Sequence, residues 1–314
     1  LALRLHDDQN QCDLLFNSIP VGAASNFAEG EEFFKSKNRC TKTGLWDYSR
    51  LWAFAVKNPA SLNFLFYLFS DLGTPSSLRT IEYYTYPLIR VEGDDVCAIK
   101  LRLIPSQREK PFSMYMAQEL AGSDSDYLLR DIFRAVKENR VYFELGAQVI
   151  PQKLWNQQES DIFNPTIMWN SAEIPIVPLG VVTVEASVKN HLEDTEKTCF
   201  RIDNLCSGLY LPDREIFREG AKTMGELSKL RVGVPYSFDE SKFSAAEIGN
   251  YKKDGVTLLK ERMTDMGERE SRRLLENIAE SLKTLDGMTL EKVLLLITDL
   301  NFSFGRALMN LLEA

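Results

Sequence analysis

Two runs of alternating apolar and polar residues constrain the fold more than any other feature of the sequence. The runs LIRV and CAIKLRLI lie within residues 88–104, and the turn 92–95 separates them. Alternation with a period of two is typical of a β-strand. A short turn joins antiparallel strands, whereas parallel strands require a long crossover. The sequence therefore predicts an antiparallel hairpin at this point.

The same alternation appears at other places along the chain. Residues 1–5 alternate between leucine and other residues, and the polar turn 7–10 precedes a second strand predicted over 12–17. A further strand is predicted over 142–150. The segment 174–187 combines two prolines with a valine-rich run, which is typical of an edge strand.

Helical periodicity dominates the remaining segments. Asn58-Pro59 is a typical helix start, because proline is tolerated in the first turn, and residues 114–137 also have a helical pattern. From residue 245 to the end the pattern is helical almost throughout. We therefore expect an α+β portion over 1–240 and a small helical domain over 241–314.

Composition and charge exclude several classes of protein. A chain of 314 residues with 44% hydrophobic and 26% charged residues has an ordinary globular composition. Its net charge is −8, without a long basic block, so we expect no nucleic-acid partner. No run of 18 apolar residues predicts a transmembrane segment. Five cysteines are odd in number and too sparse for a disulfide scaffold, which favours an intracellular, reducing compartment such as the cytosol, mitochondrion or peroxisome.

The common catalytic and cofactor motifs are absent from the sequence. It has no glycine-rich phosphate loop and no paired CxxC motif. The only histidines, His6 and His191, have no second histidine at metal-ligand spacing, and no nucleophile elbow supports a serine triad. We interpret both as solvated loop residues. The spacing of Cys199 and Cys206 is not a thiol-exchange motif, so we interpret them as buried cysteines.

Four segments, in sequence order, resemble the catalase family. LWDYSRLWAFAVKNPASLNFLFYLFSDLGTPSS is similar to the family's WDFW-type motif followed by P-x-S-L and S-D-x-G-x-P. DSDYLLRDIFRAV, FNPTIMWNSAEIPIVPLG and RRLLENIAESLK resemble three later segments of the family. The matching residues include Pro59, Ser61, Leu62, Ser70, Asp71, Gly73, Pro75, Asp126, Tyr127, Arg130, Asp131, Phe163, Thr166, Trp169, Gly180, Asn277 and Ile278.

This resemblance implies an antiparallel β-barrel with helical insertions and a C-terminal helical domain. The family's barrel has eight strands, and LALRLHDD resembles its third, so the barrel is expected to be incomplete at its N-terminal strands. An open barrel leaves unpaired edges. Either the recorded sequence is partial, or another segment covers these edges. We expect a protein partner or a second copy of the chain to cover them.

The family binds haem between a distal histidine and asparagine and a proximal tyrosinate that an arginine assists. CDLLFNSIP matches the distal asparagine with Asn17, whose alternative interpretation is a strand-end asparagine. SKLRVGVPYSFD resembles the proximal motif, with Arg231 as the arginine and Tyr236 as the iron ligand. One extra residue separates them, and in a strand it turns the tyrosine to the other face unless a bulge absorbs it. A comparable LRVAVY string occurs in the coral allene oxide synthases.

The family's distal histidine precedes LALRLHDD by several dozen residues, so His6 is not its counterpart. The family's R-H-M-x-G-Y-G-S-H stretch reads LRTIEYYTY here, so no NADPH site is recognised. One hypothesis is a haem enzyme acting on hydrogen peroxide or lipid hydroperoxides, with a histidine from an upstream segment. The other is a catalase-like protein that has lost catalysis and serves as a binding or structural subunit of a larger assembly. We favour the second for the chain as written, because a positioned acid–base group contributes about 10²- to 10⁴-fold in rate.

Overall fold

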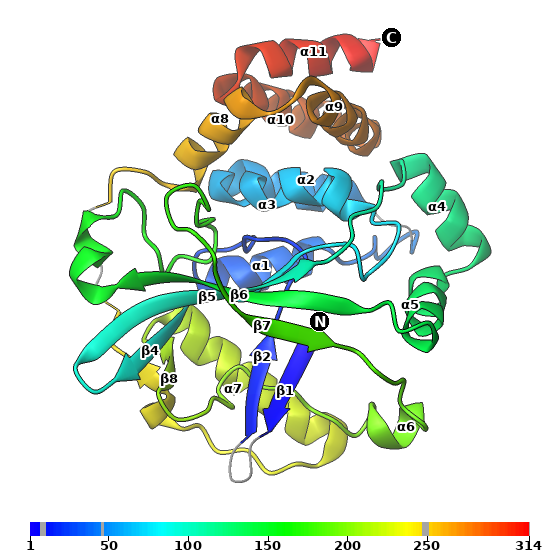
Figure 1. Ribbon diagram of the computed structural model, residues 1–314. Coiled ribbons are helices and arrows are strands. Elements are labelled where there is room, and N and C mark those ends of the chain that lie inside the picture. The colour runs from blue at the N-terminus through cyan, green and yellow to red at the C-terminus, as the bar shows by residue number, and fades with distance from the viewer. Residues whose placement is uncertain (7–10, 45–46, 247–250, 314) are drawn as a thin grey trace.

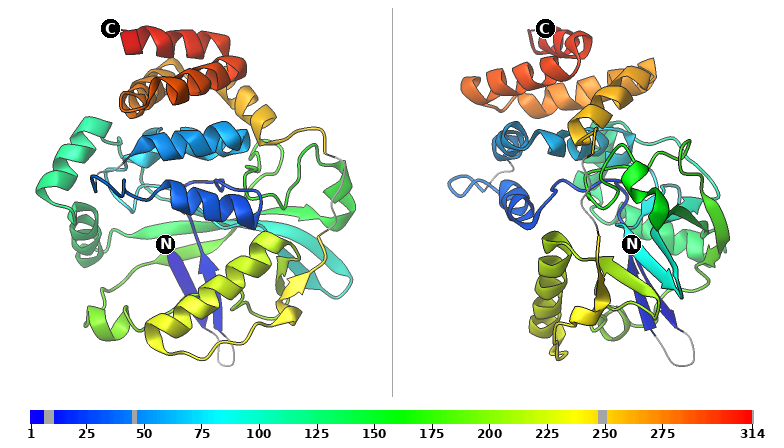
Figure 2. Two further views of the ribbon diagram at one scale, coloured as in Figure 1. Left: turned by 180° about the vertical axis from the view of Figure 1, so that it is seen from behind. Right: turned by 90° about the vertical axis from the view of Figure 1, so that its left-hand side faces the viewer.

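The computed structural model describes residues 1–6, 11–44, 47–246 and 251–313 (Figure 1). It has the predicted α+β architecture. A group of helices lies at one end, a twisted, mostly antiparallel sheet crosses the middle, and a β-hairpin with one long helix lies at the other end (Figures 1 and 2).

In the described part of the chain the main sheet has seven strands and is open. Six strands follow the order β7-β6-β5-β4-β8-β9, and β3 pairs with β5. The strands are β3 (Tyr83–Tyr84), β4 (Leu88–Glu92), β5 (Asp95–Pro105), β6 (Tyr142–Pro151), β7 (Val177–Thr183), β8 (Leu209–Pro212) and β9 (Phe243–Ser244). The predicted hairpin is confirmed, because β4 pairs antiparallel with β5. Strand β7 is an edge strand of this order, as its prolines indicated.

The amino-terminal hairpin is a separate two-stranded sheet. Strand β1 (Ala2–His6) pairs antiparallel with β2 (Gln11–Leu15), which confirms the predicted pairing, and the predicted turn 7–10 lies outside the described residues. Asn17 forms a single antiparallel bridge with Tyr84 and so joins the hairpin to the main sheet through β3. In the described residues the two sheets do not close into a barrel, in agreement with the expected incomplete barrel.

Helices occupy both ends of the molecule. They are α1 (Phe27–Ser36), α2 (Tyr48–Lys57), α3 (Leu62–Leu68), α4 (Met114–Ser123), α5 (Tyr127–Lys137), α6 (His191–Asp194), α7 (Glu215–Val232), α8 (Gly255–Asp265), α9 (Glu268–Leu282), α10 (Gly287–Leu300) and α11 (Phe302–Glu313). The helical pattern predicted over 114–137 is divided into α4 and α5, because Asp124 ends the first helix in an extended conformation. None of the described helices is long and apolar enough to span a bilayer.

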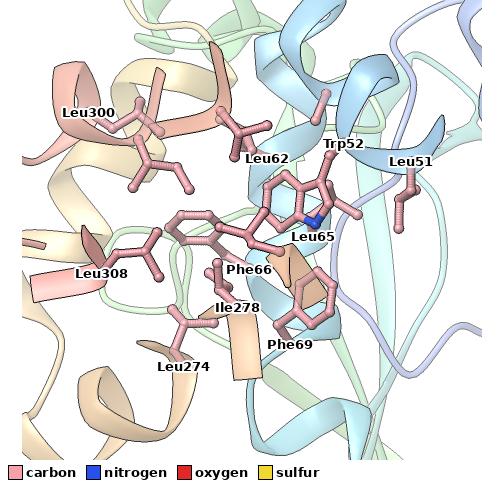
Figure 3. Close-up of a cluster of buried hydrophobic side chains, with 14 of the residues drawn as sticks. Leu51, Trp52, Leu62, Leu65, Phe66, Phe69, Leu274, Ile278, Leu300 and Leu308 are labelled. Carbon is pink, nitrogen blue, oxygen red and sulfur yellow. The ribbon is translucent and has the colours of Figure 1, made fainter. Parts of the chain in front are cut away.

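The C-terminal helices share one hydrophobic cluster with α1, α2 and α3, here called the helical core (Figure 3). Its centre is Trp52, whose ring stacks on Phe69 at 5.7 Å and whose indole N–H donates to Ser281 of α9 at 3.0 Å. Phe66 of α3 packs on Phe304 of α11 at 5.8 Å. Residues on both sides of position 240 therefore bury the same core.

A second cluster lies between the main sheet, the hairpin and α7. It contains Leu103 and Phe143 from the sheet, Leu14 from the hairpin, and Phe217 and Ala221 from α7. Because α7 extends to Val232, Arg231 lies in the last helical turn, and Gly233 ends the helix in a left-handed conformation at φ 72°. The extended conformation considered for this segment is therefore wrong for its first half.

Candidate functional site

The α1–α7 cavity is the apolar hollow between helices α1 and α7. Both views of Figure 2 place the two helices on the same side of the molecule, with α1 in blue and α7 in yellow-green. The cavity has a volume of about 760 Å³. Sites for small organic ligands commonly have volumes of this size.

Helix α1 forms one wall of the cavity, and buried and exposed apolar residues form its floor and rim. Asn26 caps α1 by accepting a hydrogen bond from the backbone N–H of Glu29, which fixes where that helix begins. The floor is buried and includes Val21 and Phe33, which are 4% and 8% exposed. Phe34 and Leu227 form the rim, where they are 68% and 58% exposed. The cavity therefore has a closed floor and an open, apolar rim.

One face of α7 supplies the opposite wall. Its contributing side chains follow helical spacing: Ile216, Gly220, Thr223, Met224 and Leu227. The other face of the helix is buried in the sheet core through Phe217, Ala221, Gly225 and Ser228.

Asn17, the residue matched to the distal asparagine, lies at the cavity. Its backbone N–H donates to the carbonyl of Tyr84 at 2.9 Å, and its own carbonyl accepts from the Tyr84 N–H at 2.8 Å. The bridge fixes the backbone of Asn17 at the end of the hairpin, and the residue lines the cavity. It is thus both a strand-end residue and a cavity residue.

Tyr236 does not line this cavity. Its ring packs against Gly225, where a Cβ atom would come within 2.2 Å of the tyrosine Cε1. Gly225 follows Thr223 by two residues, which is a rotation of about 200° around the helix. The ring of Tyr236 therefore lies on the opposite side of α7 from the cavity that contains Asn17.

The hydroxyl of Tyr236 belongs to a polar network at the base of the hairpin. It donates to the buried carboxylate of Asp203 at 3.4 Å, and the Arg201 guanidinium lies 5.0 Å from its ring centre. Burial and the nearby Asp203 charge raise the pKa of Tyr236 to about 12. Burial also raises the pKa of Asp203, against the opposing effect of Arg201. The phenol is therefore held in its protonated form near neutral pH.

The same network holds the hairpin to the rest of the molecule. Arg4 of β1 contacts Asp13 of β2 through both carboxylate oxygens, at 2.6 and 2.8 Å. Asp13 also accepts from the backbone N–H of Arg201 at 3.1 Å. These contacts give Tyr236 and its neighbours a structural role in the packing of the hairpin.

Arg231 is also away from the cavity. Its guanidinium donates to the backbone carbonyl of Glu196 at 3.0 Å and pairs with the Glu196 carboxylate at 3.2 Å. Its side chain is 50% exposed. The structure therefore separates Asn17, Arg231 and Tyr236 into three environments instead of bringing them to one site.

The residues of the α1–α7 cavity do not fit a tyrosinate-ligated haem. The polar side chains among the described lining residues are those of Asn17, Ser18, Glu31 and Thr223. This described lining contains no tyrosine, histidine or cysteine for the iron and no lysine or arginine for the haem carboxylates. A haem of the family's type requires an anionic axial oxygen, which a phenol on the far side of α7 does not supply.

The remaining candidate residues lie outside the cavity. His191 is largely exposed at the start of α6, 3.2 Å from the Glu196 carboxylate, and His6 is exposed at the end of β1. Cys199 and Cys206 are partly buried free thiols. Within the described ranges no cluster of three or more His, Cys, Asp or Glu side chains is arranged to hold a metal ion.

Sequence reasoning missed the cavity face of α7. Its side chains do follow the spacing i, i+4, i+7, i+8 and i+11, which predicts one apolar helix face. Its two small or polar members, Gly220 and Thr223, interrupt the apolar stripe. The sequence shows the spacing of these residues, but it does not show that this face of α7 lies opposite α1.

Comparisons with known proteins bear on this arrangement. The family model described as catalase matches residues 1–271. Catalase A of Botryotinia fuckeliana is 25% identical over 240 residues, which cover 75% of this chain and 50% of that protein. The peroxisomal catalase of Toxoplasma gondii is 24% identical over 239 residues, which cover 75% of this chain and 47% of that protein. The chain spans about half the length of these relatives.

Solved catalase structures share the fold. The structure of a bacterial catalase superposes with a TM-score of 0.88 at 17% identity and covers 99% of this chain and 75% of that chain. Catalase A from Saccharomyces cerevisiae gives a TM-score of 0.86 at 14% identity and covers 99% of this chain and 77% of that chain. Similarity at these identities establishes the architecture, and the chemistry has to be argued from the side chains.

Proposed function

Because the chain belongs to the catalase family, we propose that it retains the family's fold as a binding subunit of a larger assembly and has lost peroxide chemistry. The observation that carries the proposal is the position of Tyr236 on the far side of α7 from Asn17 and the α1–α7 cavity. A cavity with one amide and no axial ligand is suited to binding and not to oxygen transfer.

The titration of Tyr236 supports the same proposal. In the catalase family the haem iron is held by a tyrosinate, and a nearby cation favours that deprotonated form. Here a buried carboxylate accepts a hydrogen bond from the phenol, and the pKa of Tyr236 rises to about 12. The local electrostatics thus oppose the protonation state that iron ligation needs.

The open edge of the sheet supports a role in an assembly. Strand β7 is outermost, and Val177, Leu179 and Val181 on it are 49%, 57% and 70% exposed. An edge strand offers unpaired N–H and C=O groups, so we propose that a partner chain or a second copy adds a strand here.

Haem reconstitution tests the loss of chemistry. The purified chain is incubated with hemin and passed through gel filtration, and its absorption spectrum and oxygen release from hydrogen peroxide are recorded. We expect no stoichiometric haem and no oxygen release, because the cavity has no axial ligand. Tyr236→Phe is the test variant, and Tyr115→Phe, which replaces a tyrosine that is 75% exposed, is its control.

One result would overturn the proposal. It is one haem per chain with a Soret band that Tyr236→Phe removes and Tyr115→Phe preserves, together with oxygen release. Haem retained equally by all three proteins without oxygen release would show binding without the proposed ligand and would leave catalysis lost.

A further inference from the structure

We propose that the α1–α7 cavity is a binding site for an uncharged, largely apolar small molecule with one hydrogen-bonding group. This inference deepens the proposed function, because it names the class of ligand that a binding subunit would take. It depends on the shape of the cavity, on the charges at its rim and on a glycine of α1 that lines it.

The shape of the cavity suits a small molecule. Its volume of about 760 Å³ is lined by four phenylalanines, Phe27, Phe33, Phe34 and Phe64, which are rigid apolar surfaces. Met224 adds a flexible side chain that adapts to irregular ligands. Sites of this kind are mostly apolar, with a few polar groups that orient the ligand. Asn17 at the end of the hairpin and Thr223 on α7 are such groups.

The charges favour a neutral ligand. Glu31 is the only charged residue in the described lining, and its carboxylate pairs with Lys35 at 2.7 Å on the outer side of α1. Lys37 lies over the rings of Phe33 and Phe34, at 4.6 and 4.5 Å, but does not line the cavity. A ligand carboxylate would therefore be buried among described lining residues that include no cation, which is unfavourable. An alcohol, aldehyde or ester avoids that cost.

A glycine of α1 keeps the cavity wide. Gly30 lines the hollow from the middle of this helix. A Cβ atom at Gly30 would have its nearest neighbour 3.9 Å away, at Ala24, so packing does not require glycine there. Glycine inside a helix costs about 1 kcal/mol relative to alanine. A side chain at Gly30 would instead reduce the space between the helices.

Exposed apolar groups at the rim are consistent with an occupant. Phe34 and Leu227 face solvent from opposite helices, although both are large apolar side chains. A ligand that fills the cavity would cover them and bury their surface. This gives the binding its driving force, while the hydrogen-bonding group sets the orientation.

Fluorescence titration tests the inference. The probe is N-phenyl-1-naphthylamine, a neutral dye that fluoresces in apolar surroundings, followed by displacement with 1-dodecanol or dodecanoate. We expect one dye per chain, and displacement by the alcohol at a concentration about tenfold below that of the carboxylate, which corresponds to one logarithmic unit in affinity.

Two variants assign the dye to the cavity. Thr223→Trp fills it from α7, and Leu230→Trp, at a position 81% exposed and outside the lining, is the matched control on the same helix. Gly30→Leu fills the cavity from α1 and raises helix propensity, so lost binding in this variant does not reflect a lost helix. We expect affinity to fall about tenfold or more in Thr223→Trp and Gly30→Leu and to remain unchanged in Leu230→Trp.

The outcomes separate this inference from the proposed function. Absence of dye binding, equal binding by all three variants, or stronger displacement by dodecanoate would overturn the neutral-ligand site alone. Haem bound through Tyr236 with oxygen release would overturn the proposed loss of chemistry, whatever the dye does. If haem displaces the dye without producing oxygen, the ligand is a porphyrin and the neutral-ligand inference is wrong.

Discussion

Trp52, Leu65 and Leu274 in the helical core are fully buried, whereas Val177, Leu179 and Val181 on β7 are about half exposed or more (Figures 1 and 3). The difference follows from the backbone. A helix satisfies its hydrogen bonds internally, so helices from both ends of the chain can pack into a closed cluster. A strand requires a neighbour on each side, so an open sheet keeps an exposed edge.

The two regions also differ in the charges they bury. The helical core encloses neutral polar groups such as Ser281 and Asn277, which have hydrogen-bond partners at 3.0 and 2.7 Å. The main sheet instead buries Lys100 and Arg102 on one face of β5. Arg102 pairs with Glu82 at 2.5 Å, while Lys100 donates to the backbone carbonyl of Ile167 at 2.9 Å and lies near the Trp169 ring. We therefore expect apolar packing to dominate the stability of the helical core, and the charged residues of the main sheet to make its stability depend on pH.

The largest expected effect is the loss of stability when a side chain of the helical core is removed. Trp52→Ala removes a fully buried ring and leaves Ser281 without its donor, so we expect the free energy of unfolding to fall by about 3–5 kcal/mol. Urea denaturation followed by circular dichroism measures it. Because residues before and after position 240 share this core, wild type and variant should each unfold in one transition.

Trp52→Phe serves as the control, because it keeps most of the buried ring and should cost much less. A separate, unshifted transition for the C-terminal helices in Trp52→Ala would contradict a shared core. It would show that residues 241–314 form an independent domain.

The next largest effect is the pH dependence of stability that the buried Lys100 of the sheet should cause. Burial lowers the pKa of Lys100 from 10.5 to about 7. Between these values the unfolded chain binds a proton that the folded chain does not, so stability should rise with pH over this window. The slope from this residue is about 1.4 kcal/mol for each pH unit. Lys100→Met should remove that slope when urea midpoints are compared at pH 7.5 and 9.5.

A surface variant provides the comparison for Lys100. Lys283→Met, on the exposed side of the helical region, should leave the pH dependence unchanged, because that ammonium group is 59% exposed. Equal slopes in wild type and Lys100→Met would mean that Lys100 is charged in the folded protein.

The smallest effect on folding concerns the β7 edge. Val181→Lys should change the free energy of unfolding by less than about 0.5 kcal/mol, because the side chain is 70% exposed. It should nevertheless shift the proposed self-association toward monomer, since a lysine on an edge strand opposes strand pairing. Sedimentation velocity over a concentration series measures this shift.

Val188→Lys is the matched control, because Val188 is 48% exposed but lies beyond the end of β7. A wild-type chain that remains monomeric throughout, with no change in either variant, would count against pairing with a second copy. The proposal would then be restricted to a different protein that adds a strand at β7.

The sequence predicted local structure well wherever spacing along the chain decides it. Alternation located β4 and β5, and prolines identified β7 as an edge strand. The family resemblance matched Asn17 to a distal asparagine, and Asn17 lines the cavity, but its catalytic role stays a prediction. The proximal motif was less informative. Its residues were considered as part of a strand, whereas Arg231 lies in the last turn of α7 and Tyr236 lies beyond the end of that helix.

The periodicity of the sequence and its family motifs determined the α+β architecture, the open edge and the helical tail, because these depend on residue spacing and on local hydrogen bonding. Only the tertiary structure decided that Tyr236 meets Asp203, that Asn17 faces α7, and that the C-terminal helices share a core with α2 and α3. The physical reason is that side chains far apart in sequence meet according to the angles between packed elements. Two residues apart on α7, Thr223 lines the cavity and Gly225 meets the ring of Tyr236, because such positions face nearly opposite sides of a helix.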